Sequence, residues 1–112
     1  MHKNWLTYIC ATMQSMNYIP VKTQVEIVDS ILQIASDAIE RRDHQTLEHL
    51  SRISTSLIRP TEGSPVTLFF DLGEYLYETA THLDEVDRED TWAKEAHKSL
   101  QESLLQAREI NK

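Results

Sequence analysis

The residues best suited to chemistry or binding lie between positions 70 and 85, where acidic and aromatic side chains recur at helical spacing. Five polar residues follow one another at steps of three and four, and so share one face of a helix: Asp71, Glu74, Glu78, His82 and Glu85. Three aromatic residues flank that face: Phe70, Tyr75 and Tyr77. Like charges along a helix repel each other, and aromatic residues are enriched where proteins bind one another. The pattern predicts a docking surface for a protein partner, and a basic partner would fit it best.

A divalent cation is the alternative ligand for these carboxylates. Mg²⁺ and Ca²⁺ need clustered oxygen ligands, usually from more than one element. The chain has no Glu-x-x-His pair of the kind that di-iron bundles use. Glu74 and Glu78, with Glu85 or Asp87, resemble the glutamate pairs that hold Mg²⁺ in all-α nucleotide pyrophosphohydrolases, but Arg88 alone stands nearby to bind phosphate. We therefore predict no metal and no cofactor, and keep metal-dependent nucleotide hydrolysis as an alternative.

Two patterns around His49 suggest other enzymatic chemistry. The spacing of Arg42 and His49 resembles the loose arginine-to-histidine spacing of HEPN-type ribonucleases, which are small helical bundles. That resemblance implies that the two side chains activate a ribose hydroxyl and hold the phosphate. His49 and Arg52 also resemble the exposed histidine and following cation of phosphotransfer domains, although Ile53 stands where those domains have glycine. Both patterns are short and permissive.

The charge and the apolar runs limit the partners. The chain has 18 acidic residues against 11 lysines and arginines, a formal net charge of −7, so a nucleic-acid backbone would be repelled. The single cysteine, Cys10, cannot form an internal disulfide, which favours a cytoplasmic location. Polar residues such as Thr7 interrupt the apolar run that begins at Trp5, and no 18 apolar residues are consecutive. We expect neither a signal peptide nor a membrane span.

Helices must carry all of these residues. Two glycines and three prolines among 112 residues are too few for the turns of a sandwich or barrel, and this length favours one domain. Caps, prolines and apolar periodicity place five helices: 3–16, Pro20 or Thr23 to about Arg42, Asp43 (as N-cap) to about 58, 65–83 after an N-cap at Ser64, and 91–110. We predict an all-α fold, a single helical bundle of about five antiparallel helices over residues 1–112.

The second of these helices has the widest apolar surface. At 100° per residue its apolar side chains cover roughly half of the circumference. They are Val21, Val25, Ile27, Val28, Ile31, Leu32, Ile34, Ala35, Ala38 and Ile39. Such a helix should contact neighbours on two sides, so we expect it at the centre of the bundle. Any part of the arc that the chain cannot cover would form a homodimer interface.

These patterns favour a protein-binding module, such as an adaptor, an inhibitor, an immunity-type protein or an assembly subunit. Binding would use the acidic and aromatic face together with the acidic connection at 84–90. A ribonuclease acting through Arg42 and His49 and a metal-dependent nucleotide hydrolase are the enzymatic alternatives.

Overall fold

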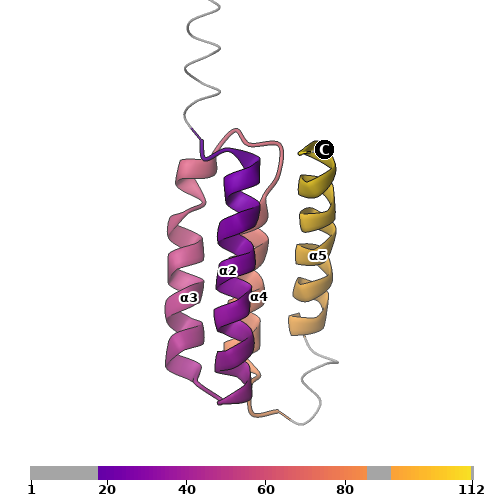
Figure 1. The fold of residues 1–112 in the computed structure, drawn as a ribbon. Coiled ribbons are helices and arrows are strands. Elements are labelled where there is room, and N and C mark those ends of the chain that lie inside the picture. The colour runs from indigo at the N-terminus through magenta and orange to yellow at the C-terminus, as the bar shows by residue number, and fades with distance from the viewer. Residues whose placement is uncertain (1–17, 86–91, 112) are drawn as a thin grey trace, which may run out of the picture.

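The computed structural model describes residues 18–85 and 92–111, and within them every regular element is a helix (Figure 1). Four α-helices pack together: α2 Val21–Glu40, α3 His44–Ser56, α4 Leu68–Thr81 and α5 Trp92–Ile110. A short 3₁₀ helix, η1 (Arg59–Thr61), lies between α3 and α4. The all-α class is confirmed. About five helices were predicted and four are found in the described residues; the fifth, predicted over 3–16, lies outside them.

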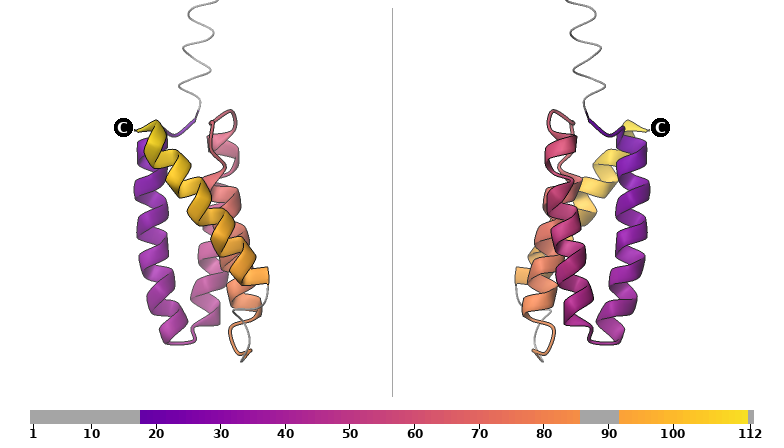
Figure 2. Two further views of the ribbon diagram at one scale, coloured as in Figure 1. Left: turned by 90° about the vertical axis from the view of Figure 1, so that its right-hand side faces the viewer. Right: turned by 90° about the vertical axis from the view of Figure 1, so that its left-hand side faces the viewer.

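Successive helices run in opposite directions. In Figure 1, α2 descends from the end where the described chain begins, α3 returns, α4 descends again and α5 returns to the same end. Figure 2 shows α5 crossing the bundle at an angle, with its first turns towards α4 and its last turns towards α2. An ion pair agrees with that course, since Arg108 near the end of α5 contacts Asp29 of α2 at 3.1 Å.

Local backbone geometry fixes the turn between α2 and α3. Arg42 has a φ of 53°, and its N–H donates to the carbonyl of Ile39 (3.1 Å). The N–H of Asp43 donates to the carbonyl of Ala38 (2.8 Å), which completes a Schellman ending. The carboxylate of Asp43 then accepts bonds from the hydroxyl and the amide of Thr46, which hold the pKa of Asp43 below its usual value. The predicted N-cap and tight hairpin are confirmed.

The central helix is α4. It contacts all three other helices and packs most closely against α3 and α5. Its buried residues are Leu68, Phe69, Leu72, Gly73, Leu76, Thr79 and Ala80. The contacts of α2 with α3, α4 and α5 are less close, and its apolar flanks remain only partly covered. The prediction that the helix from Pro20 or Thr23 to about Arg42 forms the centre of the bundle is wrong. The width of an apolar arc shows how many apolar residues a helix carries, but not how closely the neighbouring helices pack against it.

Small residues allow α3 and α4 to approach each other closely. A Cβ added at Gly73 would lie 3.2 Å from Oγ1 of Thr55, tighter than ordinary van der Waals contact. The hydroxyl of Ser51 donates to the carbonyl of Gly73 at 3.1 Å, and Ser54 beside it is fully buried. This contact fixes the position and rotation of α4 relative to α3, and therefore which side chains of α4 face outward.

At the opposite end of the bundle from the α2–α3 turn, the buried side-chain amide of Gln24 contacts Ser64, the residue that was predicted to cap α4. The helix begins at Leu68, three residues later than the predicted start, and Ser64 does not cap it. The hydroxyl of Ser64 accepts bonds from the N–H of Val66 (3.4 Å) and from Nε2 of Gln24 (3.1 Å), and the same Nε2 donates to the carbonyl of Ile19 (2.7 Å). Gln24 is fully buried and thus joins the start of α2 to the loop before α4.

Replacing Gln24 should therefore destabilise the bundle. In Gln24→Leu the carbonyl of Ile19 and the hydroxyl of Ser64 lose their donor inside the protein, which typically costs about 1–3 kcal/mol. Urea unfolding followed by circular dichroism measures this change. Gln33→Leu, an exposed position on the same helix, is the matched control and should change stability by less than about 0.5 kcal/mol. Equal effects of the two substitutions would contradict this role for Gln24.

Candidate functional site

The predicted acidic and aromatic face of α4 divides into two parts. Phe70, Glu74 and Tyr77 are exposed and follow one another at steps of four and three along the helix. Phe70 retains 55% and Tyr77 61% of its full exposure. Glu74 has no hydrogen bond or ion pair within residues 18–85 and 92–111. We call these three residues the α4 ridge.

The other part of the predicted face turns towards α5. Asp71 accepts a hydrogen bond from Oγ1 of Thr67 at 3.1 Å and a second, short one from the hydroxyl of Ser103 in α5. The ring of Tyr75 packs against that of His97, with centroids 5.0 Å apart and planes inclined at 37°. Asp71 and Tyr75 thus help to hold α5, so they are not free to meet a partner.

His82 lies between two carboxylates at the end of α4. Its Nε2 is 3.4 Å from Glu78 and its Nδ1 is 2.9 Å from Glu85, and the side chains of His82 and Glu78 are each only 21% exposed. The hydrogen bond and charge of Glu85, aided by Glu78, raise the pKa of His82, although partial burial opposes them. Two of the predicted docking carboxylates are therefore already paired.

The first residues of the predicted acidic connection are also occupied. Asp84 lies 2.9 Å from Nε2 of His44 and 3.4 Å from Nη1 of Arg42. Arg42 reaches the carbonyl of Leu83 (3.4 Å), and Nδ1 of His44 lies 3.3 Å from the carbonyl of Ala80. Cationic groups near free carbonyls suit the end of a helix. The α2–α3 turn thus caps α4, while residues 86–90 of the predicted contact lie outside the described residues.

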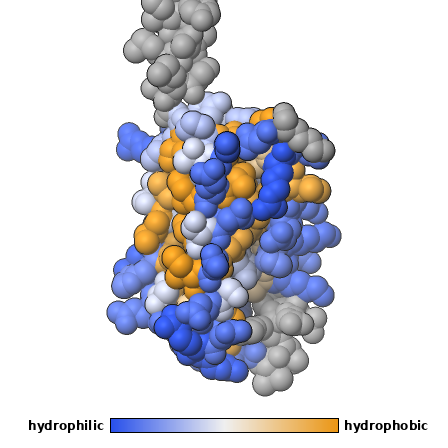
Figure 3. All heavy atoms as spheres, in the orientation of Figure 1, coloured by the Kyte–Doolittle hydropathy of each residue, from blue (hydrophilic) through white to orange (hydrophobic). Residues whose placement is uncertain are grey.

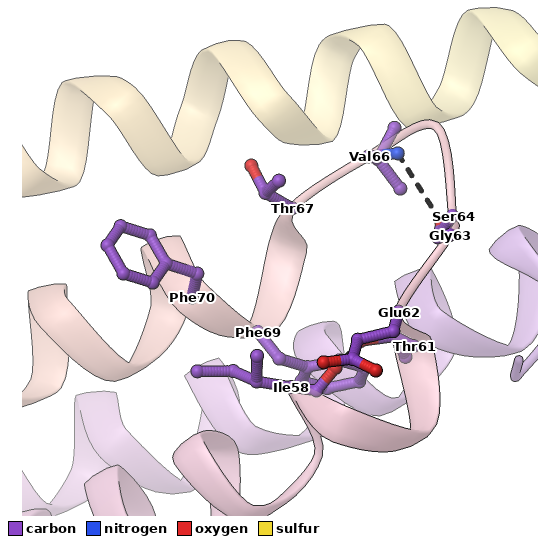
Figure 4. Close-up of a pocket in the computed structure, with 9 residues that line it drawn as sticks. All are labelled: Ile58, Thr61, Glu62, Gly63, Ser64, Val66, Thr67, Phe69 and Phe70. Carbon is purple, nitrogen blue, oxygen red and sulfur yellow. Dashed lines mark hydrogen bonds between the residues drawn. The ribbon is translucent and has the colours of Figure 1, made fainter.

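A pocket that was not predicted from the sequence adjoins the ridge. It has a volume of about 180 Å³ and lies between the loop after η1 and the first turn of α4 (Figure 4). Its lining residues are Ile58, Thr61, Glu62, Gly63, Ser64, Val66, Thr67, Phe69 and Phe70. Gly63 has a φ of 87°, a conformation that favours glycine, and a turn around this residue was the one signal in the sequence that pointed here.

A second exposed apolar surface lies along α2 and α3. Figure 3 shows hydrophobic side chains gathered along the line between these two helices. Ile34 of α2 and Ile53 of α3 are each 49% exposed. Asp29 faces α5, and Ile34 lies about 140° further round α2, on the side of α3. We call Ile34 and Ile53 the α2–α3 seam.

The residues of the enzymatic alternatives are not brought together. Arg42 and His44 both reach Asp84, whereas His49 lies about 140° from His44 around α3 and is exposed. Glu74 and Glu78 belong to one helix, and Asp87 lies outside the described residues. In the part of the chain that the structure describes, no group of three or more histidine, cysteine, aspartate or glutamate residues could hold a metal ion. None of the described helices is both long enough and apolar enough to span a membrane.

Comparison of the chain with protein-family models, with curated proteins and with solved structures finds no match in any of the three. The interpretation of the site therefore depends on its own geometry and chemistry.

The contacts of His82 predict a pH dependence of stability. Because its pKa is raised above the ordinary value of 6.5 in the folded state, protonated His82 stabilises the fold fully below that value, and the effect is lost as the pH rises through the raised pKa. The difference in unfolding free energy between the wild type and His82→Gln should thus be larger at about pH 6 than at about pH 8.5. Urea unfolding at both pH values measures it. The control is His49→Gln, at an exposed histidine that makes no ion pair within the described residues. Its difference in unfolding free energy from the wild type should be nearly the same at the two pH values.

Proposed function

We propose that the protein is a protein-binding module and that the α4 ridge is its contact surface. The observation that carries this proposal is the exposure of two aromatic rings, Phe70 and Tyr77, with the unpaired carboxylate of Glu74 between them. These rings stand on a helix whose opposite side is buried against three neighbours. Aromatic side chains that remain exposed on a rigid element are typical of binding hot spots.

The rigidity of α4 supports a binding role for the ridge. The close approach at Gly73 fixes α4 against α3, and the contacts of Asp71 and Tyr75 fix it against α5. A partner would therefore meet side chains whose backbone is already held in place, which lowers the entropic cost of binding. The ridge spans two turns of α4, enough for an approaching helix or extended segment.

The charge of the chain favours a basic partner. The formal net charge is −7, and Glu74 offers an unpaired carboxylate at the centre of the ridge. Such a surface speeds encounter with a positively charged protein and opposes the approach of a nucleic acid. A cytoplasmic location, argued from the single cysteine, belongs to the same proposal.

Substitution of the ridge should remove binding and leave the fold intact. We expect Glu74→Lys combined with Tyr77→Ala to keep the helical circular dichroism, because both side chains are exposed, and to weaken partner binding at least about tenfold. Capture from a lysate of the source organism with the immobilised wild-type chain identifies the partner, and calorimetry with the purified partner gives the affinities.

The control for this experiment carries the same two kinds of change elsewhere. Glu26→Lys with Leu105→Ala alters exposed positions on α2 and α5 and should leave partner binding unchanged. Equal affinity of the wild type and the ridge variant would contradict the proposed contact surface. Glu78 is left unchanged in the ridge variant, since its loss would also disturb the contacts of His82.

The α2–α3 seam favours a second candidate, a homodimer. Ile34 and Ile53 leave half of their surfaces in water, and an isologous pairing would cover both in each copy. Light scattering should then give twice the mass of 13.0 kDa at high concentration, and Ile34→Glu with Ile53→Glu should return the monomer mass. A monomeric wild type over the whole concentration range would exclude the seam as a stable dimer interface.

A further inference from the structure

The pocket beside the ridge combines an apolar interior with one carboxylate. Ile58, Val66 and Phe69 supply aliphatic and aromatic carbon, and the ring of Phe70 borders the same space. Figure 4 shows the carboxylate of Glu62 over Ile58 and Phe69. Within the described residues Glu62 makes no side-chain hydrogen bond or ion pair, and Arg59 on the adjacent turn does not pair with it. The pocket thus offers surface for a carbon chain and an unpaired negative charge at its rim.

We propose that this pocket binds an arginine side chain of the protein that docks on the α4 ridge. The inference rests on the proposed function and specifies its partner. The methylene groups of an arginine would lie along Ile58, which is partly exposed, and the guanidinium would reach the carboxylate of Glu62. Phe70 lines the same pocket, and an exposed aromatic ring of this kind can contact a cation through its face.

Other occupants fit this lining less well. A purely apolar side chain would cover the carboxylate of Glu62 without pairing it, which opposes binding. An acidic side chain would be repelled by Glu62 and by the net charge of the chain. Lysine supplies a charge, but its ammonium is more strongly hydrated and lacks the planar group that stacks on an aromatic ring. Arginine satisfies both the carboxylate and the ring.

The pocket is continuous with the ridge through Phe70, which belongs to both. Glu74 lies four residues further along α4, about 6 Å along the helix axis. A partner segment with two cations would therefore place one at Glu62 and the other at Glu74. Phe70 thus lies between two carboxylates, those of Glu62 and Glu74, that make no side-chain hydrogen bond or ion pair within the described residues.

The test uses the full chain and three capped alanine pentapeptides that differ only at the central residue. That residue is arginine, its neutral analogue citrulline, or norleucine. In ¹H–¹⁵N spectra the arginine peptide should shift the amide signals of Glu62, Gly63 and Thr67 at millimolar concentration. Citrulline should bind about five- to thirtyfold more weakly, since it loses both the ion pair and the contact with the ring. Norleucine binding as tightly as arginine, or shifts confined to other residues, would overturn the proposal.

Variants of the protein separate the pocket from the ridge. Glu62→Gln should weaken the arginine peptide about two- to fivefold, whereas Glu26→Gln on α2 should have no effect. If the ridge variant loses the partner while the arginine peptide leaves the pocket signals unmoved, the pocket proposal fails and the proposed function stands. If the peptide binds as expected while the ridge variant keeps full partner affinity, the proposed contact surface fails instead.

Discussion

The close packing of α4 against α3 and α5 is the constraint on which the rest of this molecule depends. Gly73 lets the backbones of α3 and α4 approach, and Asp71 and Tyr75 hold α5 on the adjacent side. Because the rotation of α4 is fixed by these contacts, one narrow strip of its surface is left in water. Phe70, Glu74 and Tyr77 occupy that strip, so packing on one side of the helix determines what is presented on the other.

The two ends of the bundle are closed by different chemistry. At the end where α2 begins, a neutral buried amide joins α2 to the loop before α4. At the end where α4 stops, charged side chains from the α2–α3 turn meet Asp84 and the last carbonyls of that helix. The neutral end borders the pocket, and the charged end contains most of the carboxylates that the sequence had suggested for docking.

Features that depend on neighbouring residues could be predicted, and those that depend on distant ones could not. The hairpin and its cap at Asp43 follow from residues that lie within five positions of one another. The predicted start of α4 was wrong: the hydroxyl of Ser64 accepts bonds from Val66 and from Gln24, which lies 40 positions away, and the helix begins only at Leu68. Periodicity correctly placed Asp71 and Glu74 on one side of a helix, but it could not tell which of them α5 would cover. The pocket was missed for the same reason, since its walls come from a loop and a helix.

Arg42, in the turn between α2 and α3, meets two structural requirements that favour different residue types. Its left-handed backbone would be most easily adopted by glycine, whereas contact with Asp84 requires a long cationic side chain. In homologous chains the residues at positions 42, 44 and 84 should therefore change together: a relative that keeps an acid at position 84 should keep a cation at position 42 or a histidine at position 44. Correlated substitutions at these positions would show whether the charged end of the bundle is under selection.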